Sequence, residues 1–275
     1  MKTERKHGQP GPILALDTAT ASMAAAIIDE SGVLAEIQSL AERNHSVHVV
    51  SHVKEMLASS GIKDSELAAI AVGSGPGSYT GMRIAVAVAK TLAWVWEKPL
   101  VGVSSLEAIA YGAWHHVSLE EEKTAAEWIS GGEHWVIPIM DARRGQVYTS
   151  AFSMSDGGEW TRWADDGVRL MNGWVEKLAE RLSAGGSSAV RSITIAGDLT
   201  LHEAEAQRLK ALAEASGTTV RLQPFVQEGR WIAELGRKKL EAGQTENPHT
   251  FIPNYTQLTE AEVIWKAKQA GEAER

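Results

Sequence analysis

The sequence has no cysteine, no long apolar run and no excess of positive charge. Without cysteine, disulfide bonds, thiolate zinc sites, iron–sulfur clusters and a cysteine nucleophile are all excluded, and a reducing compartment is favoured. No stretch approaches the roughly 18 apolar residues of a membrane span, so no membrane contact is expected. Residues 1–12 are polar and contain Gly and Pro, unlike a signal peptide. We expect a cytoplasmic protein with a short disordered N-terminal segment.

Acidic residues outnumber basic ones: the sequence has 27 Lys and Arg and 35 Asp and Glu, which gives a formal net charge of -8. Nucleic-acid-binding domains usually present a basic face to phosphates, so an independent nucleic-acid-binding module is disfavoured, whereas a local basic patch is compatible with the net charge. The 275 residues are 44% hydrophobic and 23% charged, as in ordinary globular proteins. This length accommodates one large domain or two of roughly 100–150 residues.

Apolar runs and turn signals predict the same order of elements twice: three strands, a helix, a strand and a helix. Asp17 and Gly73 in the first half have counterparts in Asp141 and Gly197, both 124 positions later. A shared offset indicates an internal duplication. We therefore predict an α/β protein with two duplicated βββαβα-type domains and the actin-like ATPase (ASKHA) architecture, in which Asp-bearing hairpins from both halves face a nucleotide cleft.

The predicted domain boundaries follow from this repeat. Residues 1–12 precede the fold, and residues 13–115 form the first actin-like domain. A charged stretch, residues 116–134, is the expected linker or insertion. Residues 135–255 form the second actin-like domain, and a C-terminal helix over residues 256–272 is expected to join the first domain.

The sharpest local motif is the glycine-rich stretch GSGPGSYTG, residues 73–81, between a predicted strand and a predicted helix. Glycines permit positive φ and close backbone approach, and Ser78 or Thr80 can cap the helix. Free N–H groups at a helix start attract anions. The stretch matches neither a P-loop nor a dinucleotide fingerprint. Two interpretations remain open: contact with a phosphate or a partner's backbone, and a tight strand-to-helix turn.

Asp17 and Asp141 each end a predicted strand beside small residues. Paired carboxylates could hold Mg²⁺ and phosphates in a cleft between the domains. Alternatively, each Asp caps its own turn.

Histidines cluster on the first predicted helix. His48 and His52 are four residues apart, so they share a helix face and could bind a metal. No carboxylate follows as in a zincin HExxH motif, and the opposite side is apolar, so a polar face or a subunit interface is favoured. The adjacent His115 and His116 cannot share a face and are predicted at a loop or helix end.

Four stretches together resemble the TsaB (YeaZ) family: ILALDTAT, NHSVH, AIAVGSGPGSYTGMRIAVAVAKTLAW with KPLVGVSSLEAIA behind it, and DARRGQVY. The resemblance is strong over residues 13–152, weaker over 155–245, and resumes in IPNYTQLTEAEVIW. It implies the two-domain actin-like fold. It also implies the dimerisation subunit of the bacterial machinery that makes threonylcarbamoyladenosine in tRNA.

The resemblance further implies a non-catalytic scaffold or activator, not an enzyme by itself. Its expected partner is a TsaD-like transferase, which transfers threonylcarbamoyl to the N6 of the adenosine next to the anticodon. A TsaE-like ATPase is expected to join them. ATP and metal are expected on these partner subunits, with no cofactor in this chain. Alone, the chain is expected to form a homodimer, and tRNA is expected to be contacted only through the complex.

One motif departs from the transferase pattern. TsaD-like proteins carry a metal-binding H-x-x-x-H in a VNHLEGH-like stretch, and this sequence has VSSLEAI there, with Ser105 and Ile109 at the two His positions. Ile cannot bind a metal and a lone Ser is a poor ligand. We therefore expect no catalytic and no metal-binding residues. The alternative is a catalytically active, ATP- or metal-dependent TsaD-like transferase, which would hold stoichiometric metal or hydrolyse ATP.

Two sets of site residues follow from the resemblance. The expected partner interface lies on the helices predicted over residues 44–60 and 80–96, with the candidates His45, His48, His52, Met56, Met82 and Val86. The expected vestigial nucleotide cleft consists of Asp17, Thr18, Gly75, Gly77 and Asp141.

Overall fold

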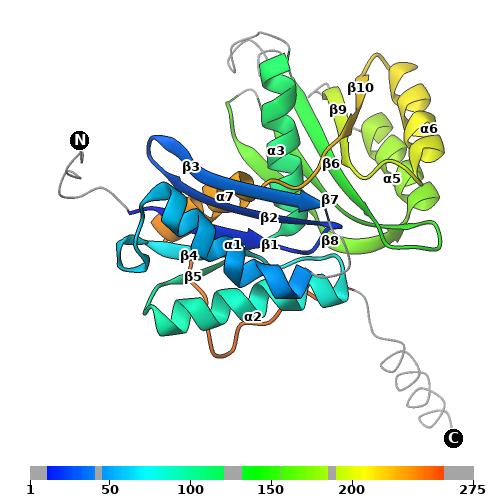
Figure 1. Ribbon diagram of the computed structural model, residues 1–275. Helices are drawn as coiled ribbons and strands as arrows, with labels where there is room; N and C mark the ends of the chain where they lie inside the picture. Colours follow the sequence, from blue (N-terminus) through cyan, green and yellow to red (C-terminus); the bar gives the residue numbers. More distant parts are fainter. Residues whose placement is uncertain (1–10, 41–44, 121–131, 156, 185–189, 257–275) are drawn as a thin grey trace, which may run out of the picture.

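The computed structural model of the protein describes residues 11–40, 45–120, 132–155, 157–184 and 190–256 (Figure 1). Within these residues, no helix is long and apolar enough to cross a membrane. The predicted N-terminal disordered segment, apart from residues 11–12, and the predicted C-terminal helix, apart from residue 256, lie outside the described residues.

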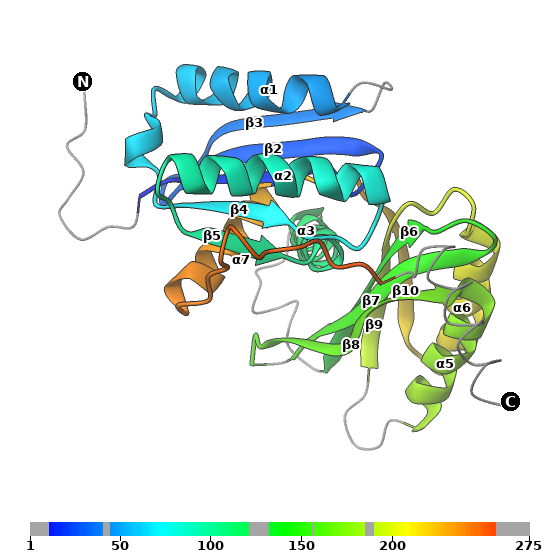
Figure 2. The same ribbon diagram turned by 90° about the horizontal axis from the view of Figure 1, so that it is seen from below.

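The first sheet has the strand order β3-β2-β1-β4-β5. Its central strand β1 runs antiparallel to β2 and parallel to β4, and all five of its residues are buried. Both faces of the sheet are therefore covered, which explains why β1 is apolar up to its final Asp. Helices α1 and α2 cover one face (Figure 2). The elements are β1 (Ile13–Asp17), β2 (Ser22–Asp29), β3 (Gly32–Leu40), α1 (His45–Ser60), β4 (Ala69–Gly73), α2 (Tyr79–Val95) and β5 (Leu100–Val103), with a short 3₁₀ helix at Asp64–Glu66.

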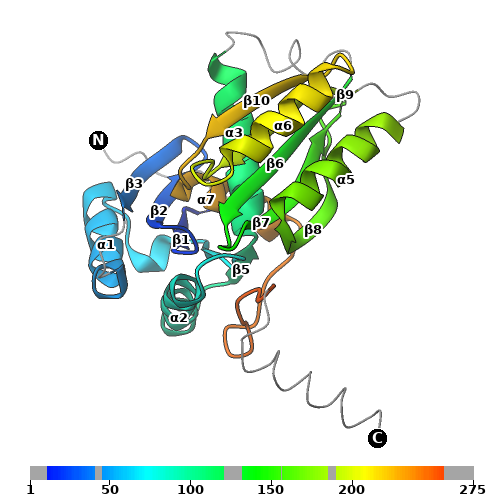
Figure 3. The same ribbon diagram turned by 90° about the vertical axis from the view of Figure 1, so that its right-hand side faces the viewer.

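The second sheet repeats this order as β8-β7-β6-β9-β10, with β6 in the place of β1. It again combines antiparallel pairs, β6 with β7 and β7 with β8, with parallel pairs on the other side. Helices α5 and α6 lie side by side against it (Figure 3). The predicted duplication and actin-like architecture are confirmed. The elements are β6 (Glu133–Asp141), β7 (Gln146–Met154), β8 (Trp160–Leu170), α5 (Met171–Ala184), β9 (Val190–Gly197), α6 (Glu203–Glu214) and β10 (Thr219–Pro224).

The two halves exchange one helix each. Helix α3 (Ser105–Glu120) follows the first sheet in sequence but packs on β6, β7 and β9 of the second. Helix α7 (Gly229–Glu241) follows the second sheet but packs on β1, β2, β4 and β5 of the first. Ile232 and Leu235 of α7 join the core around Ile13. Neither sheet is therefore covered by its own half of the chain alone.

The predicted boundaries need correction on this account. Residues from α7 onward belong with the first sheet, although residues 135–255 were expected to form the second domain. After α7, Glu246 N donates to Leu100 O at 2.8 Å and Lys90 Nζ donates to Phe251 O at 2.6 Å, so this segment follows β5 and α2. The expected linker is also narrower: residues 116–120 continue α3, residues 133–134 begin β6, and residues 121–131 lie outside the described ones.

Helices α3 and α7 meet through an aromatic contact that joins the two sheets. His115 lies in α3, as does His116, and its ring stacks on Trp231 of α7 with centroids 4.9 Å apart. Tyr111 contacts the same indole edge-on at 5.8 Å, and Trp231 Nε1 donates to Glu228 Oε2 at 2.7 Å. Burial, followed by the positive charge of Lys238, lowers the pKa of His115 to about 4. The stacked imidazole is therefore neutral near pH 7.

Replacing Trp231 with alanine is expected to destabilise the protein by about 2 kcal/mol, because the partly buried indole loses its ring contacts and its hydrogen bond. Trp94→Ala is a matched control, since Trp94 is 63% exposed and its ring contact is with His249. It is expected to change stability by less than about 0.5 kcal/mol. Urea denaturation of both variants measures the difference. Equal losses would contradict a joining role for the α3–α7 contact.

Candidate functional site

The glycine-rich loop, residues 73–81, packs directly against the turn between β1 and β2. Ser78 N donates to Ala19 O at 2.8 Å, and Thr18 Oγ1 donates to Gly81 O at 2.6 Å. A Cβ on Gly81 would lie 1.9 Å from Thr18 O, and a Cβ on Gly77 would lie 2.4 Å from Ala19 O. Only glycine leaves room for this approach of two backbones.

Several backbone donors of this loop are used inside the protein. Ser74 N donates to Val103 O at 2.8 Å, and Gly75 N donates to Ser105 Oγ at 3.1 Å. Ser78 also serves as the N-cap of α2, where its side chain accepts from Gly81 N. These bonds support the tight-turn interpretation, because they use N–H groups that a phosphate cradle would need free; the N–H groups of Tyr79 and Thr80, at the start of α2, are not among them.

Asp17 is enclosed at the end of β1, with 1% of its surface exposed. Its Oδ1 accepts a hydrogen bond from Ala19 N at 2.7 Å, and its Oδ2 makes no hydrogen bond. A Cβ on Gly73 would lie 2.2 Å from the carboxyl carbon, so the neighbouring strand closes over this group. Burial raises the pKa of Asp17 to about 6, against the opposing effect of hydrogen bonds from Ala19, Ser105 and Thr18. A carboxylate so enclosed has no surface on which to hold a phosphate-bound metal.

Asp141 has a different environment, although it lies at the same offset in the repeat. Its side chain is partly exposed, and its Oδ1 lies 3.0 Å from Nε2 of the buried His202. In the first sheet Leu16, the residue before Asp17, pairs with Val72, the residue before Gly73. In the second sheet Ile139 pairs with Gly197, so Asp141 lies two residues beyond the level of that glycine. The pairing of β6 with β9 is thus displaced by two residues relative to that of β1 with β4.

The two positions that resemble a metal site hold no ligand pair. Ser105 Oγ accepts from Gly75 N, and Ile109 is 1% exposed and belongs to a core cluster with Met140 and Phe225. The place of a second histidine is thus filled by apolar side chains. Within the described ranges, no group of three or more His, Asp or Glu residues could hold a metal ion.

The prediction that three apolar residues belong to the partner interface is wrong. Met56, Met82 and Val86 are 1%, 3% and 4% exposed and face the sheet, so they cannot contact a partner. Of the histidines, His48 is exposed and His52 is partly buried, with Nδ1 3.5 Å from Glu55 Oε2. The side chain of His45 lies outside the described ones.

Helices α1 and α2 lie side by side on the first sheet (Figure 2), and their outward sides are called the α1–α2 surface. These two helices carry exposed apolar residues that the sequence reasoning missed: Val50, Tyr79, Ala87, Trp94 and Val95. The missed signal is that apolar residues occur on both sides of each helix, more than one buried face requires.

An aromatic cluster lies at the start of α2. The Arg83 guanidinium lies 4.0 Å from the ring centroid of Tyr79, and Arg83 Nε donates to Tyr255 Oη at 2.9 Å. The two tyrosine rings are 5.3 Å apart. This cluster fastens the last described residues to the α1–α2 surface.

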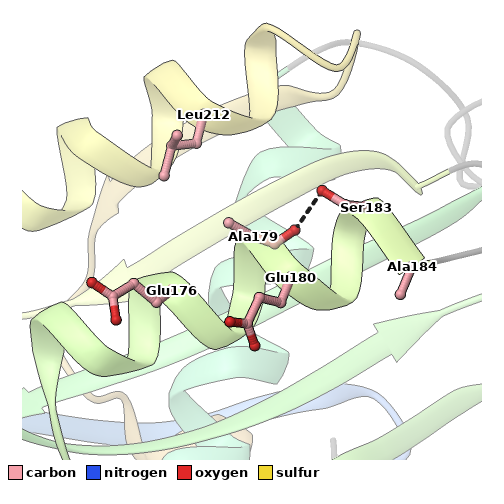
Figure 4. Close-up of a pocket in the computed structure, with 6 residues that line it drawn as sticks. All are labelled: Glu176, Ala179, Glu180, Ser183, Ala184 and Leu212. Carbon is pink, nitrogen blue, oxygen red and sulfur yellow. Dashed lines mark hydrogen bonds between the residues drawn. The ribbon is translucent and has the colours of Figure 1, made fainter.

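A separate hollow lies between α5 and α6 (Figure 4). None of its lining residues is a predicted site residue, and one of its two glutamates, Glu176, is paired with Arg208 at 3.1 Å. The residues that line the hollow include no histidine, arginine or lysine, and the carboxylate of Glu176 is already neutralised by Arg208. Its lining consists of Glu176, Ala179, Glu180, Ser183, Ala184 and Leu212.

Comparison with known proteins gives consistent results. A family model described as TsaD, tRNA N6-adenosine threonylcarbamoyltransferase, matches residues 16–265. A Bacillus subtilis protein named tRNA threonylcarbamoyladenosine biosynthesis protein TsaB is 33% identical over 258 residues, covering 94% of this chain and 99% of the relative. The Escherichia coli protein of that name is 34% identical over 148 residues, covering 54% of this chain and 58% of the relative. The solved structure of YeaZ from Pseudomonas aeruginosa has a TM-score of 0.65 at 20% identity, covering 89% of this chain and 99% of that one, which shows a shared fold.

Proposed function

Because the chain belongs to the TsaB (YeaZ) family of tRNA threonylcarbamoyladenosine biosynthesis proteins, we propose that it is a non-catalytic subunit that pairs with and activates a TsaD-like transferase. The observation that carries the non-catalytic role is the enclosed site around Asp17 and Ile109. A buried carboxylate and an apolar cluster stand where a transferase would need an accessible metal. The reaction on tRNA would then take place on the partner subunit, with this chain holding no cofactor.

The α1–α2 surface supports the pairing role. Val50, Trp94 and Val95 are 44%, 63% and 59% exposed, and so many large apolar groups on two neighbouring helices favour contact with another protein. A second helix pair laid on these helices would form a four-helix bundle. A TsaD-like transferase, which shares the family model, fits as the partner. The same surface could join two copies of this chain when the transferase is absent, and a TsaE-like ATPase would join the assembled complex.

Ala87→Arg is expected to reduce recovery of the complex at least tenfold while leaving the melting temperature unchanged. Ala87 lies exposed on α2, so a long cation is tolerated by the free chain but obstructs a packed helix pair. Val86→Arg is expected to unfold the protein instead, because Val86 is buried. Leu212→Arg on α6 is the control that should not affect pairing. Size-exclusion co-elution with the transferase measures recovery, and normal recovery of the Ala87→Arg complex would exclude this interface.

The pathway itself is tested by nucleoside mass spectrometry of tRNA from cells depleted of the protein. Loss of threonylcarbamoyladenosine supports the proposal, and normal levels contradict it. The competing function, an active TsaD-like transferase, is favoured by the match to the TsaD family model and by partial matches to relatives named as that transferase. Stoichiometric bound metal, or ATP turnover by the isolated chain, would establish that function and overturn the non-catalytic role.

A further inference from the structure

The tip of the β6–β7 hairpin holds two arginines in an unusual backbone conformation. Arg143 and Arg144 have φ of 66° and 53°, and Gly145 follows with 72°. Ala142 N donates to Gln146 O, and Gln146 N donates to Arg143 O, both at 2.9 Å, so the turn is closed by its own backbone. Glycine and asparagine adopt positive φ readily, whereas a long side chain disfavours it. The sequence thus keeps two cations where uncharged residues would fit the backbone better.

Both arginine side chains are free to bind an external group. They are exposed, and in the described part of the chain neither guanidinium donates a hydrogen bond or forms an ion pair. Some other arginines are paired, such as Arg162 with Glu107 at 2.9 Å and Arg208 with Glu176 at 3.1 Å. Two adjacent unpaired guanidinium groups are notable in a chain with 35 acidic residues and 27 basic ones.

The surroundings of the turn fix its position and include charges of both signs. Arg143 N donates to Asp141 Oδ1 at 3.1 Å, and Met171 N donates to Gly145 O at 3.0 Å, which ties the tip to the start of α5. The first turn of α5 has no acidic residue, so the positive end of its dipole is not neutralised there. The carboxylate of Asp141 is the opposing charge: its Oδ1 accepts from Arg143 N and lies 3.0 Å from His202 Nε2, so it holds the turn and points part of its charge toward His202.

We propose that the Arg143–Arg144 turn binds phosphate groups of an RNA backbone and gives this subunit a direct contact with the tRNA substrate. The inference rests on the proposed function, which supplies the RNA. Guanidinium groups bind phosphate oxygens in bidentate fashion, and a rigid turn loses little conformational freedom when it does so. The expected contact with tRNA through the complex would then include residues of this chain.

The test uses the double variant Arg143→Asn/Arg144→Gly in the reconstituted complex with the transferase. Asparagine and glycine suit positive φ, so the melting temperature should be equal or higher. Binding of a labelled, unmodified tRNA transcript is measured between 50 and 300 mM salt. We expect about a tenfold loss of affinity at low salt and a salt slope that is smaller by about 1.5, since each lost phosphate contact lowers it by about 0.7–0.9.

The control variant Arg191→Gln/Lys210→Gln removes the same charge elsewhere on the second domain. Arg191 lies next to the start of β9, at the end of the sheet opposite Asp141. It should change the affinity less than twofold. An equal loss in both variants would reduce the effect to net charge and overturn the site.

The remaining outcomes separate this inference from the proposed function. If the complex assembles and the double variant binds tRNA like the parent, the RNA contact is wrong and the scaffold role stands. If ATP binding by the complex is lost while tRNA binding is kept, the turn serves nucleotide phosphates and the RNA contact is overturned. If no complex assembles, the scaffold role fails, and the RNA contact is then judged with the isolated chain, where absence of binding rejects it.

Discussion

Replacing Asp17 with asparagine is expected to raise the free energy of unfolding by up to about 3 kcal/mol above pH 7. In the folded protein the pKa of Asp17 is about 6, whereas its ordinary value is 3.8. A pKa difference of about 2 corresponds to about 3 kcal/mol. Because Asp17 is 1% exposed, solvent screening does not reduce this figure. Asparagine keeps the acceptor for Ala19 N and carries no charge to bury.

The direction of the pH dependence follows from proton binding. Below pH 3.8 the carboxyl is protonated in both states and has no effect on stability. As the pH rises to about 6, the unfolded chain releases its proton first, so the folded state loses stability, and above pH 6 the loss is constant. The gain from Asp17→Asn should therefore appear between pH 4 and pH 6 and level off above that range.

Chemical denaturation at several pH values from 4 to 8 measures this gain. Asp17→Ala is the matched control: it also removes the charge, but it leaves Ala19 N without its acceptor and opens a cavity, so it should be less stable than the asparagine variant. An asparagine variant whose stability follows that of the parent at every pH would show that Asp17 is not buried as described.

Replacing Gly81 with alanine is expected to destabilise the protein by at least about 3 kcal/mol, enough to prevent folding at 37 °C if the parent is of ordinary stability. The added Cβ would lie 1.9 Å from Thr18 O, which is backbone and cannot rotate away. To relieve the contact, α2 must move away from the β1–β2 turn. That movement would also break the hydrogen bond from Thr18 Oγ1 to Gly81 O.

Gly173→Ala is the control for Gly81→Ala, because an alanine side chain fits at position 173. Gly173 lies in α5, and its added Cβ would meet nothing within 4 Å. Alanine favours a helix over glycine by about 1 kcal/mol, so this variant should be slightly more stable than the parent. Thermal unfolding of the two variants compares them directly. A folded, stable Gly81→Ala protein would mean that the loop is not held against the turn.

The order of elements could be predicted because strong local signals mark it. Gly61 stops α1, and each predicted strand that ends at Asp17, Gly73 or Asp141 ends there in the structure. The bounds of strand β8 could not be predicted from the sequence, because its residues are mostly half-buried and do not alternate cleanly between apolar and polar.

The orientation of α1 and α2 could not be obtained from periodicity. In α1 the apolar residues Val49, Val53 and Met56 are buried, yet Val50 beside them is 44% exposed. In α2 alanines occur on the inner face at Ala85 and on the outer face at Ala87. When both faces of a helix are apolar, the pattern does not say which one meets the sheet, so buried residues were assigned to a partner surface.

The environments of Asp17 and Asp141 depend on the register of strand pairing and on contacts between residues far apart in the sequence. Asp17 and Asp141 occupy equal positions in the repeat, but a two-residue displacement in strand pairing leaves Asp17 buried and Asp141 partly exposed. No local signal carries that displacement. The exchange of α3 and α7 is equally non-local, because each helix packs on the sheet that its own half does not form.

The exchanged helices set a constraint on synthesis at the ribosome. The back of the first sheet, around Ile13, Ala71 and Val103, is completed only when Ile232 of α7 arrives. The chain emerges from its N-terminus, so this apolar surface waits for more than 120 further residues after β5 has been made. During that time the first half is a natural client for a chaperone that shields apolar surface. In a fragment that stops before α7, this apolar surface would stay uncovered. Such a fragment should therefore be recovered from cells mainly as aggregate.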